Sequence, residues 1–156
     1  MLPWGMGILI LLVDQWTKAL IRQHWAYAES RPIIEGFFHL VYVRNDGAAW
    51  SILSGQQLIL ILISVAVLVF LIWKGRAEFM VNWLRQVVFG LLMGGIAGNL
   101  ADRIRFGWVT DFLDFQFGSY HFPSFNIADA AICIAVFLYL YSDLKARSQQ
   151  RVHDAT

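Results

Sequence analysis

The sequence predicts an all-α membrane protein, a single domain over residues 1–156, with four transmembrane helices, an external strand region and an aromatic-rich interfacial segment. The first observation is composition: 58% of the residues are hydrophobic, 15% are charged and the mean hydropathy is +0.57. A soluble domain of this length does not carry such a balance. The second is four apolar segments, each approaching the length of about 20 residues that a membrane span needs. They cover about residues 2–21, 58–73, 84–100 and 127–141.

Charge and cysteine usage exclude several other classes of function. The formal net charge of +1 gives no basic surface for nucleic acid. The single cysteine, Cys133, cannot form an intrachain disulfide, and we expect it to be a small buried hydrophobic residue. The histidines are scattered along the chain, so no metal or cofactor site is predicted.

Topology follows from the number of spans and the distribution of basic residues. Met1–Val13 has the apolar character of a signal peptide but lacks its basic start and cleavage site, so we predict a retained first span. Four spans place both termini on one side. Basic residues between spans two and three and in the tail favour cytoplasmic termini, although the preference is small because the opposite loops also carry arginines.

The connection between the first two spans, residues 23–57, is too long for a simple turn. Phe38–Arg44 is rich in aromatic and β-branched residues and predicts a strand. Asn45-Asp46-Gly47 is a turn signal, and a tight turn by itself explains these residues. Trp50 suits the lipid headgroup region.

The connection between the last two spans, residues 105–124, is dense in aromatic side chains. A loop surrounded by water would not carry so many aromatic side chains, so we predict a segment lying on or in the membrane interface. Asp111 falls within this predicted loop. The aromatic residues that carry the prediction, up to the start of the last span, are Phe106, Trp108, Phe112, Phe115, Phe117, Tyr120, Phe122 and Phe125.

Polar residues within the first and third spans each allow two interpretations. Asp14 and Lys18 are four residues apart on one helix face, where they form either a local ion pair or part of a site. Asn99 and Arg103 also share a face, and Arg103 belongs either to a buried pair with an aspartate or to a set of hydrogen-bonding groups under a site. Small residues at Gly90, Gly94, Gly95 and Gly98 predict a face for close helix packing.

Two carboxylates stand out as candidates for chemistry. Asp111 and Asp129 both lie in apolar surroundings at a membrane boundary, where an ionisable residue is costly and indicates function. Asn126, three residues before Asp129, is placed to cap the last helix. Two carboxylates that share a proton can activate water and hydrolyse an amide. A proton-coupled transporter is the alternative, but it favours carboxylates in mid-span or inverted repeats, and neither is visible.

Five motifs in order make the chain resemble the bacterial lipoprotein signal peptidases (signal peptidase II) over nearly its whole length. They are Asp14-Gln-x-x-Lys18, Asn45-x-Gly-Ala-Ala49, Gly-Gly95-x-x-Gly-Asn99-x-x-Asp-Arg103, Val109-x-Asp111-Phe and Phe125-Asn-x-Ala-Asp129. Thr110 stands where a second valine is common in the family.

The resemblance implies a four-span aspartic endopeptidase with a small external β-cradle. It further implies removal of signal peptides from diacylglyceryl-modified prolipoproteins, before the lipidated cysteine, by a monomer in the bacterial cytoplasmic (inner) membrane. The active site is expected on the external face, in contact with lipid, with substrate acyl chains beside the glycine-lined span. The catalytic pair falls on Asp111 and Asp129. Substrate-binding or supporting positions fall on Asp14, Lys18, Asn45, Gly47, Gly95, Asn99, Arg103, Asn126 and Ala128.

Overall fold

The computed structural model describes residues 2–48 and 52–154, and within them four helices are long and apolar enough to cross a membrane. Ala49 and Trp50 lie outside the described residues. The second span is α2, which continues without a break through a π-helical turn, η2, into α3. The helical elements are α1 (Leu2–His24), α2 (Gln57–Phe70), η2 (Leu71–Gly75), α3 (Arg76–Phe79), α4 (Trp83–Phe106) and α5 (Ile127–Asp154).

Each spanning helix extends beyond the apolar segment that predicts it. The sequence predicts the third span near residues 84–100, whereas α4 ends at Phe106. There Gly107 takes a φ of 78°, and its N–H donates to the Arg103 carbonyl, which closes the helix. The difference arises because hydropathy falls where polar side chains begin, while a helix continues until its backbone is capped.

The central helix is α4, which packs against α1, α5 and α2. The predicted glycine packing face is confirmed, because a Cβ on Gly90 would lie 2.7 Å from the Pro3 carbonyl oxygen. On the other side of α4, a Cβ on Gly95 would lie 2.6 Å from the Ala128 carbonyl oxygen. These glycines therefore face α1 and α5, and the course of substrate acyl chains beside this span stays a prediction.

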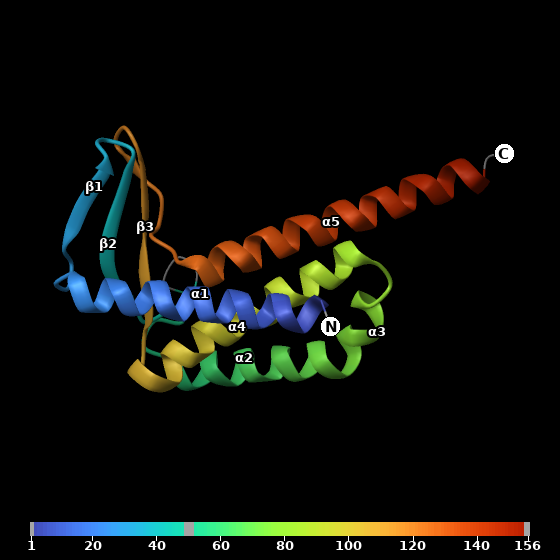
Figure 1. The fold of residues 1–156 in the computed structure, drawn as a ribbon, viewed down its shortest axis with the longest axis horizontal. Helices are drawn as coiled ribbons and strands as arrows, with labels where there is room; N and C mark the ends of the chain where they lie inside the picture. The colour runs from blue at the N-terminus through green and yellow to red at the C-terminus, as the bar shows by residue number, and fades with distance from the viewer. Residues whose placement is uncertain (1, 49–51, 155–156) are drawn as a thin grey trace.

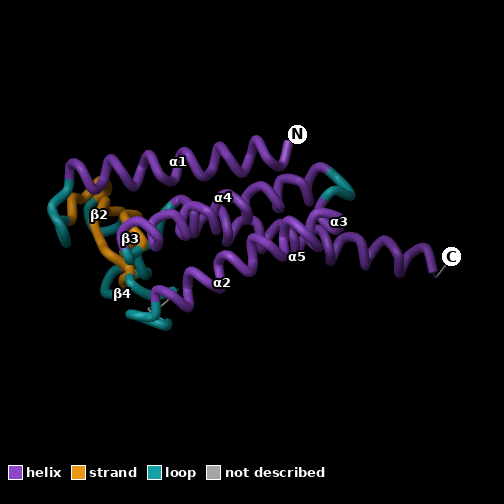
Figure 2. The backbone as a smooth tube through the Cα atoms, turned by 90° about the horizontal axis from the view of Figure 1, so that it is seen from below, coloured by secondary structure: helices purple, strands orange, loops and turns teal. Residues whose placement is uncertain are grey.

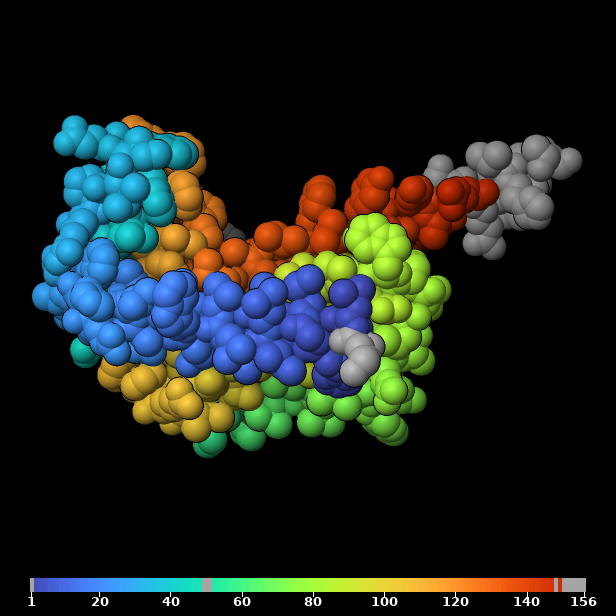
Figure 3. Space-filling view, in the orientation of Figure 1, coloured from blue at the N-terminus to red at the C-terminus, as the bar shows by residue number. Residues whose placement is uncertain are grey.

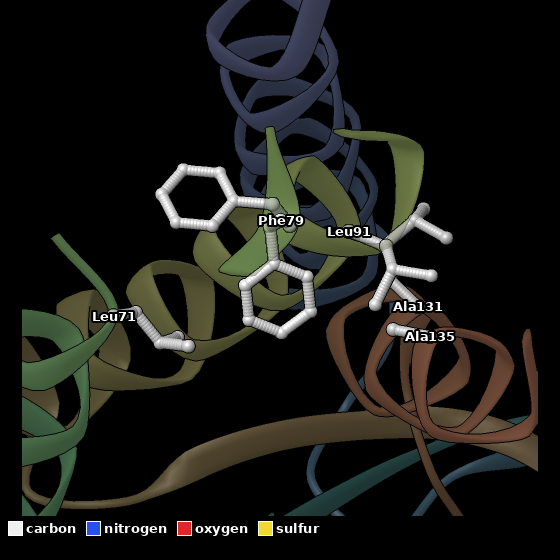
Figure 4. Packing of buried hydrophobic residues seen from close by; sticks show 7 residues of the cluster. Leu71, Phe79, Leu91, Ala131 and Ala135 are labelled. Carbon is white, nitrogen blue, oxygen red and sulfur yellow. The ribbon is translucent and has the colours of Figure 1, made fainter. Parts of the chain in front are cut away.

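Two apolar clusters hold the helices and the sheet together. The larger cluster joins η2, α3, α4 and α5 at the end of the bundle away from the sheet, and Figure 4 shows the side chains converging between these helices. The smaller cluster joins α1 to the sheet through Ile21, Tyr42 and Phe112. Members of the larger cluster are Leu71, Phe79, Val88, Phe89, Leu91, Ala131 and Ala135.

A four-stranded antiparallel sheet in the order β1-β2-β3-β4 lies at one end of the helices. Its second strand confirms the strand predicted at residues 38–44. The predicted loop at residues 105–124 is wrong, because much of it forms β3 and β4, and Asp111 lies in β3 opposite Val43. Aromatic residues favour strands as well as membrane interfaces, so this segment alone does not distinguish the two. The strand β2 that pairs with β3 is distant in the sequence, so the pairing was not evident from the segment itself. The strands are β1 (Ser30–Ile34), β2 (Phe38–Asn45), β3 (Val109–Phe117) and β4 (Tyr120–His121).

The sheet and the chain termini lie at opposite ends of the bundle (Figure 1). Figure 2 shows α1 and α4 running side by side away from the strands, in agreement with their extensive packing. In the space-filling view the sheet stands up from the bundle, with a hollow between it and α5 (Figure 3). Residues at the ends of several helices and strands therefore meet where the sheet joins the bundle.

Candidate active site

Asp111 is held by two asparagine side chains that come from different parts of the chain. It lies on β3 and is only 2% exposed. Asn45 Nδ2 donates to Asp111 Oδ2 at 3.0 Å, and Asn126 Nδ2 donates to Asp111 Oδ1 at 2.7 Å. Asn45 Oδ1 also accepts from the Gly47 N–H at 3.0 Å, so the predicted turn is confirmed and the same side chain contacts Asp111.

Asp129 lies in the first turn of α5, where Asn126 caps the helix as predicted. Asn126 Oδ1 accepts from the Asp129 N–H at 2.9 Å, and the Asn126 N–H donates back to Asp129 Oδ2 at 3.3 Å. Asn99 Nδ2 from α4 donates to Asp129 Oδ1 at 2.7 Å. The Asn126 amide thus contacts both aspartates and fixes the position of one relative to the other.

A buried ion-pair network lies under the two aspartates. Lys18 Nζ is 2.9 Å from Asp14 Oδ2, and both side chains are fully buried. This confirms the predicted local pair, but Lys18 Nζ also donates to Asn99 Oδ1 at 2.9 Å. Asp14 Oδ1 accepts from the Ala128 N–H at 2.9 Å. The pair therefore orients Asn99 beneath Asp129 and holds the start of α5.

Asp102 is the central residue of this network that our site prediction omits. Its Oδ2 lies 3.6 Å from Lys18 Nζ and accepts from the Thr110 N–H at 3.0 Å. Gln15 Nε2 donates to its Oδ1 at 3.0 Å, and Arg22 Nη1 lies 3.6 Å from the same oxygen. Its spacing of three residues from Asn99 is the signal that could have identified it.

Arg103 points away from that network. Its Nη2 donates to the Gly47 carbonyl at 3.0 Å. The interpretation of Arg103 as one half of a buried pair with Asp102 is wrong, because adjacent helical residues project in different directions and Asp102 pairs with Lys18. Arg103 instead joins the turn after β2 to the end of α4.

Both aspartates line one cavity of about 590 Å³ between the sheet and α5. Asn45, Asn99 and Arg103 also line it, and its apolar wall includes Phe125 and Ile132. A smaller cavity of about 230 Å³ beside α2 shares Asp129, Asn99 and Arg103. Asp129 therefore borders both cavities, whereas Asp111 borders only the larger one.

Cys133 also lines the larger cavity, which corrects the expectation that it is buried in the helix packing. It is exposed. Four residues separate it from Asp129, so it lies one helical turn further along the same face of α5. An apolar run predicts a spanning helix but does not reveal which of its faces borders a cavity.

The environment of Asp111 favours its protonated form. Burial raises the pKa of Asp111 to about 7, and the nearby charge of Asp129 adds to this effect. Hydrogen bonds from Asn45 and Asn126 and the charge of Lys18 oppose the increase in pKa. A carboxyl group with such a pKa can donate a proton near neutral pH. Across residues 2–48 and 52–154, no three His, Cys, Asp or Glu side chains are grouped as metal ligands.

Comparison with known proteins identifies the family to which this site belongs. The family model described as "Signal peptidase (SPase) II" matches residues 6–145. The chain belongs to the signal peptidase II family. It is therefore a lipoprotein signal peptidase, a multi-pass membrane protease that functions in lipoprotein processing.

Individual signal peptidases and solved structures agree with this assignment. The "Lipoprotein signal peptidase" of Syntrophus aciditrophicus is 40% identical over 151 residues, covering 92% of this chain and 91% of the relative. That of Syntrophotalea carbinolica is 46% identical over 136 residues, covering 85% and 84%. A solved "Bacterial membrane enzyme structure by the in meso method at 2.3 A resolution" is 34% identical, with a TM-score of 0.85, and covers 94% of this chain and 90% of its own.

Proposed function

We propose that this signal peptidase is an aspartic endopeptidase in which Asp111 and Asp129 activate water. The observation that carries the proposal is that the carboxylates of buried Asp111 and partly buried Asp129 line one cavity, with the Asn126 side chain donating to Asp111 and the Asn126 N–H donating to Asp129. Two carboxyl groups that share one proton supply both an acid and a base, so hydrolysis needs no covalent enzyme intermediate.

The hydrogen-bond pattern supports different roles for the two aspartates. Lys18 donates to the oxygen of the Asn99 amide, whose nitrogen donates to Asp129. The cation polarises this amide and favours a negative charge on Asp129. We infer that ionised Asp129 takes a proton from water while protonated Asp111 donates to the scissile carbonyl oxygen. As the tetrahedral intermediate collapses, the C–N bond breaks, the proton gained by Asp129 passes to the leaving amine, and a hydroxyl of the intermediate returns a proton to Asp111.

Charge balance supports one shared proton. In the network beneath the site, Asp14 and Asp102 face the cations Lys18 and Arg22. Arg103 lines the cavity beside the two aspartates. A singly protonated pair carries one negative charge, which the guanidinium of Arg103 offsets, whereas a doubly ionised pair leaves a buried charge uncompensated.

We propose that the substrate is a diacylglyceryl-modified prolipoprotein cut before its lipidated cysteine. The carboxylates lie where the spanning helices meet the sheet, and the cavity has apolar walls. A bond beside a lipidated residue is presented at this level of a bilayer. We further propose a single-domain monomer in the bacterial cytoplasmic membrane, with the sheet on the external face. The termini lie at the other end of the bundle (Figure 1), which supports cytoplasmic ends.

Cleavage of a synthetic lipidated reporter peptide by purified protein in detergent tests the proposal. We expect Asp111→Asn and Asp129→Asn each to lower turnover about a thousandfold or more, because each removes an acid or base while keeping the shape. Asp143→Asn, on α5 away from the cavity, is the matched control and keeps the wild-type rate. Substantial turnover by either folded active-site variant refutes the aspartic mechanism. Equal cleavage of an unlipidated peptide refutes the substrate assignment.

A further inference from the structure

Asp114 is a buried carboxylate for which the proposed chemistry has no use. It lies on β3, three residues after Asp111, and is only 7% exposed. Among the residues that the structure describes, no basic side chain lies within ion-pair distance of it. A buried carboxylate without a cation is costly, so its hydrogen bonds are needed to keep it there.

Two side chains supply those hydrogen bonds. Gln116 Nε2, on the same strand, donates to Asp114 Oδ2 at 2.7 Å. Ser124 Oγ donates to Asp114 Oδ1 at 3.5 Å, a long contact from the segment that precedes α5. On the other side of β3, His39 is the register partner of Asp114. Asp114 thus lies between β2 and the segment that leads into α5.

Backbone pairing holds that segment against β3 beside Asp114. Leu113 forms a β-bridge with Phe125: the Phe125 N–H donates to the Leu113 carbonyl at 3.1 Å, and the Leu113 N–H donates back at 2.9 Å. The next antiparallel pair along this bridge is Asp114 with Ser124, whose side chains share a face of the sheet. The segment runs along β3 into α5 (Figure 1).

The residue that follows this bridge is Asn126. Its side chain donates to Asp111 and caps the helix turn that carries Asp129. Any shift of the Ser124–Phe125 segment along or away from β3 therefore moves Asn126 and changes the separation of the two carboxylates. Asp114 contacts the first residue of this segment, because it accepts a hydrogen bond from Ser124.

We propose that Asp114 is a positioning residue for peptide-bond cleavage: it holds Ser124, and through the Leu113–Phe125 bridge it fixes Asn126 and the geometry between Asp111 and Asp129. The inference rests on the proposed function of these two residues. Asp114 itself touches no reacting atom, so its effect is on turnover and not on the binding of substrate.

The test is a double-mutant cycle between Asp114→Ala and Ser124→Ala, with kcat and KM measured separately on the lipidated reporter. We expect Asp114→Ala to lower kcat at least about tenfold with KM nearly unchanged, since an ångström of misplacement can cost about a hundredfold. Ser124→Ala lowers kcat less, and the double variant is no slower than Asp114→Ala because both changes break one contact. Asp114→Asn keeps a partner for both Gln116 and Ser124, so it retains most of the activity.

Glu35→Ala, in the exposed turn between β1 and β2, is the control and keeps the wild-type kcat. A wild-type kcat for Asp114→Ala, independent effects of the two substitutions, or an Asp114→Asn as slow as Asp114→Ala each overturns the inference. If Asp114→Ala does not fold, Ser124→Ala must still lower kcat at the wild-type melting temperature, and an unchanged kcat rejects the role. Full activity of Asp111→Asn would instead reject the proposed function, so the two failures are distinguishable.

Discussion

Replacing Asn126 with alanine, and separately with serine, distinguishes its capping of α5 from its effect on the pKa of Asp111. The alanine substitution removes the acceptor for the Asp129 N–H and the donor to Asp111 Oδ1. Loss of an N-cap side chain costs about 1 kcal/mol of stability. Loss of a hydrogen bond to a charged group costs about 1.5–3 kcal/mol, and here that cost applies only to the ionised form of Asp111.

The sign of the effect on pH dependence follows directly. Asn126 donates to the carboxylate and opposes the increase in the pKa of Asp111, so its removal raises that pKa further above about 7. In the proposed mechanism activity requires protonated Asp111, so we expect activity to be lost as pH rises through this pKa. The basic limb of the kcat/KM profile therefore moves to higher pH by at least about one pH unit. The maximal rate falls about tenfold to a hundredfold because Asp111 is no longer joined through the Asn126 side chain to the helix turn that carries Asp129.

Asn126→Ser is the matched control, because serine caps a helix but is too short to reach Asp111. Reporter cleavage across a pH series, with melting temperatures in the same detergent, measures both properties for both variants. We expect serine to restore the melting temperature and not the rate or the pH profile. A basic limb that stays in place or moves to lower pH in Asn126→Ala refutes the role of Asn126 in setting the proton affinity of Asp111.

Further predictions concern the arginine, the ion-pair network, metals and topology. Arg103→Lys should lower turnover with little change in melting temperature, because lysine cannot reproduce the guanidinium contact with Gly47. Asp14→Ala should lower the melting temperature, since Lys18 keeps only the more distant Asp102 as an ion-pair partner and the Ala128 N–H at the start of α5 loses its acceptor. If Arg103→Lys instead lowered the melting temperature and Asp14→Ala only lowered turnover, the supporting role of Asp14 and the site role of Arg103 would have to be exchanged. Chelators should leave cleavage in detergent unchanged, and inhibition that zinc reverses would contradict the water-activating aspartate pair. A C-terminal reporter should be active in the cytoplasm, and activity only outside it would invert the proposed orientation.

The spans and the family could be predicted, and the two candidate aspartates could be singled out, because each depends on local sequence. Apolar length is a property of consecutive residues, and the motifs around Asp111 and Asp129 are contiguous in the chain. The Asp14–Lys18 pair was predictable for the same reason, since four residues place both side chains on one helix face. The turn at Asn45 and the cap at Asn126 also depend on only a few neighbouring residues.

Tertiary structure alone decided which of these local features meet. Lys18 and Asn99 are 81 residues apart, and Asn45 and Asp111 are 66 apart, so no local pattern indicates either hydrogen bond. Strand β3 forms because β2 lies beside it, and the aromatic residues that make this segment strand-like also make it resemble an interfacial loop. The exposure of Cys133 depends on a cavity that exists only once the sheet stands over α5. Side-chain partners and cavities are properties of packed surfaces, and the sequence specifies them only through the fold that brings those surfaces together.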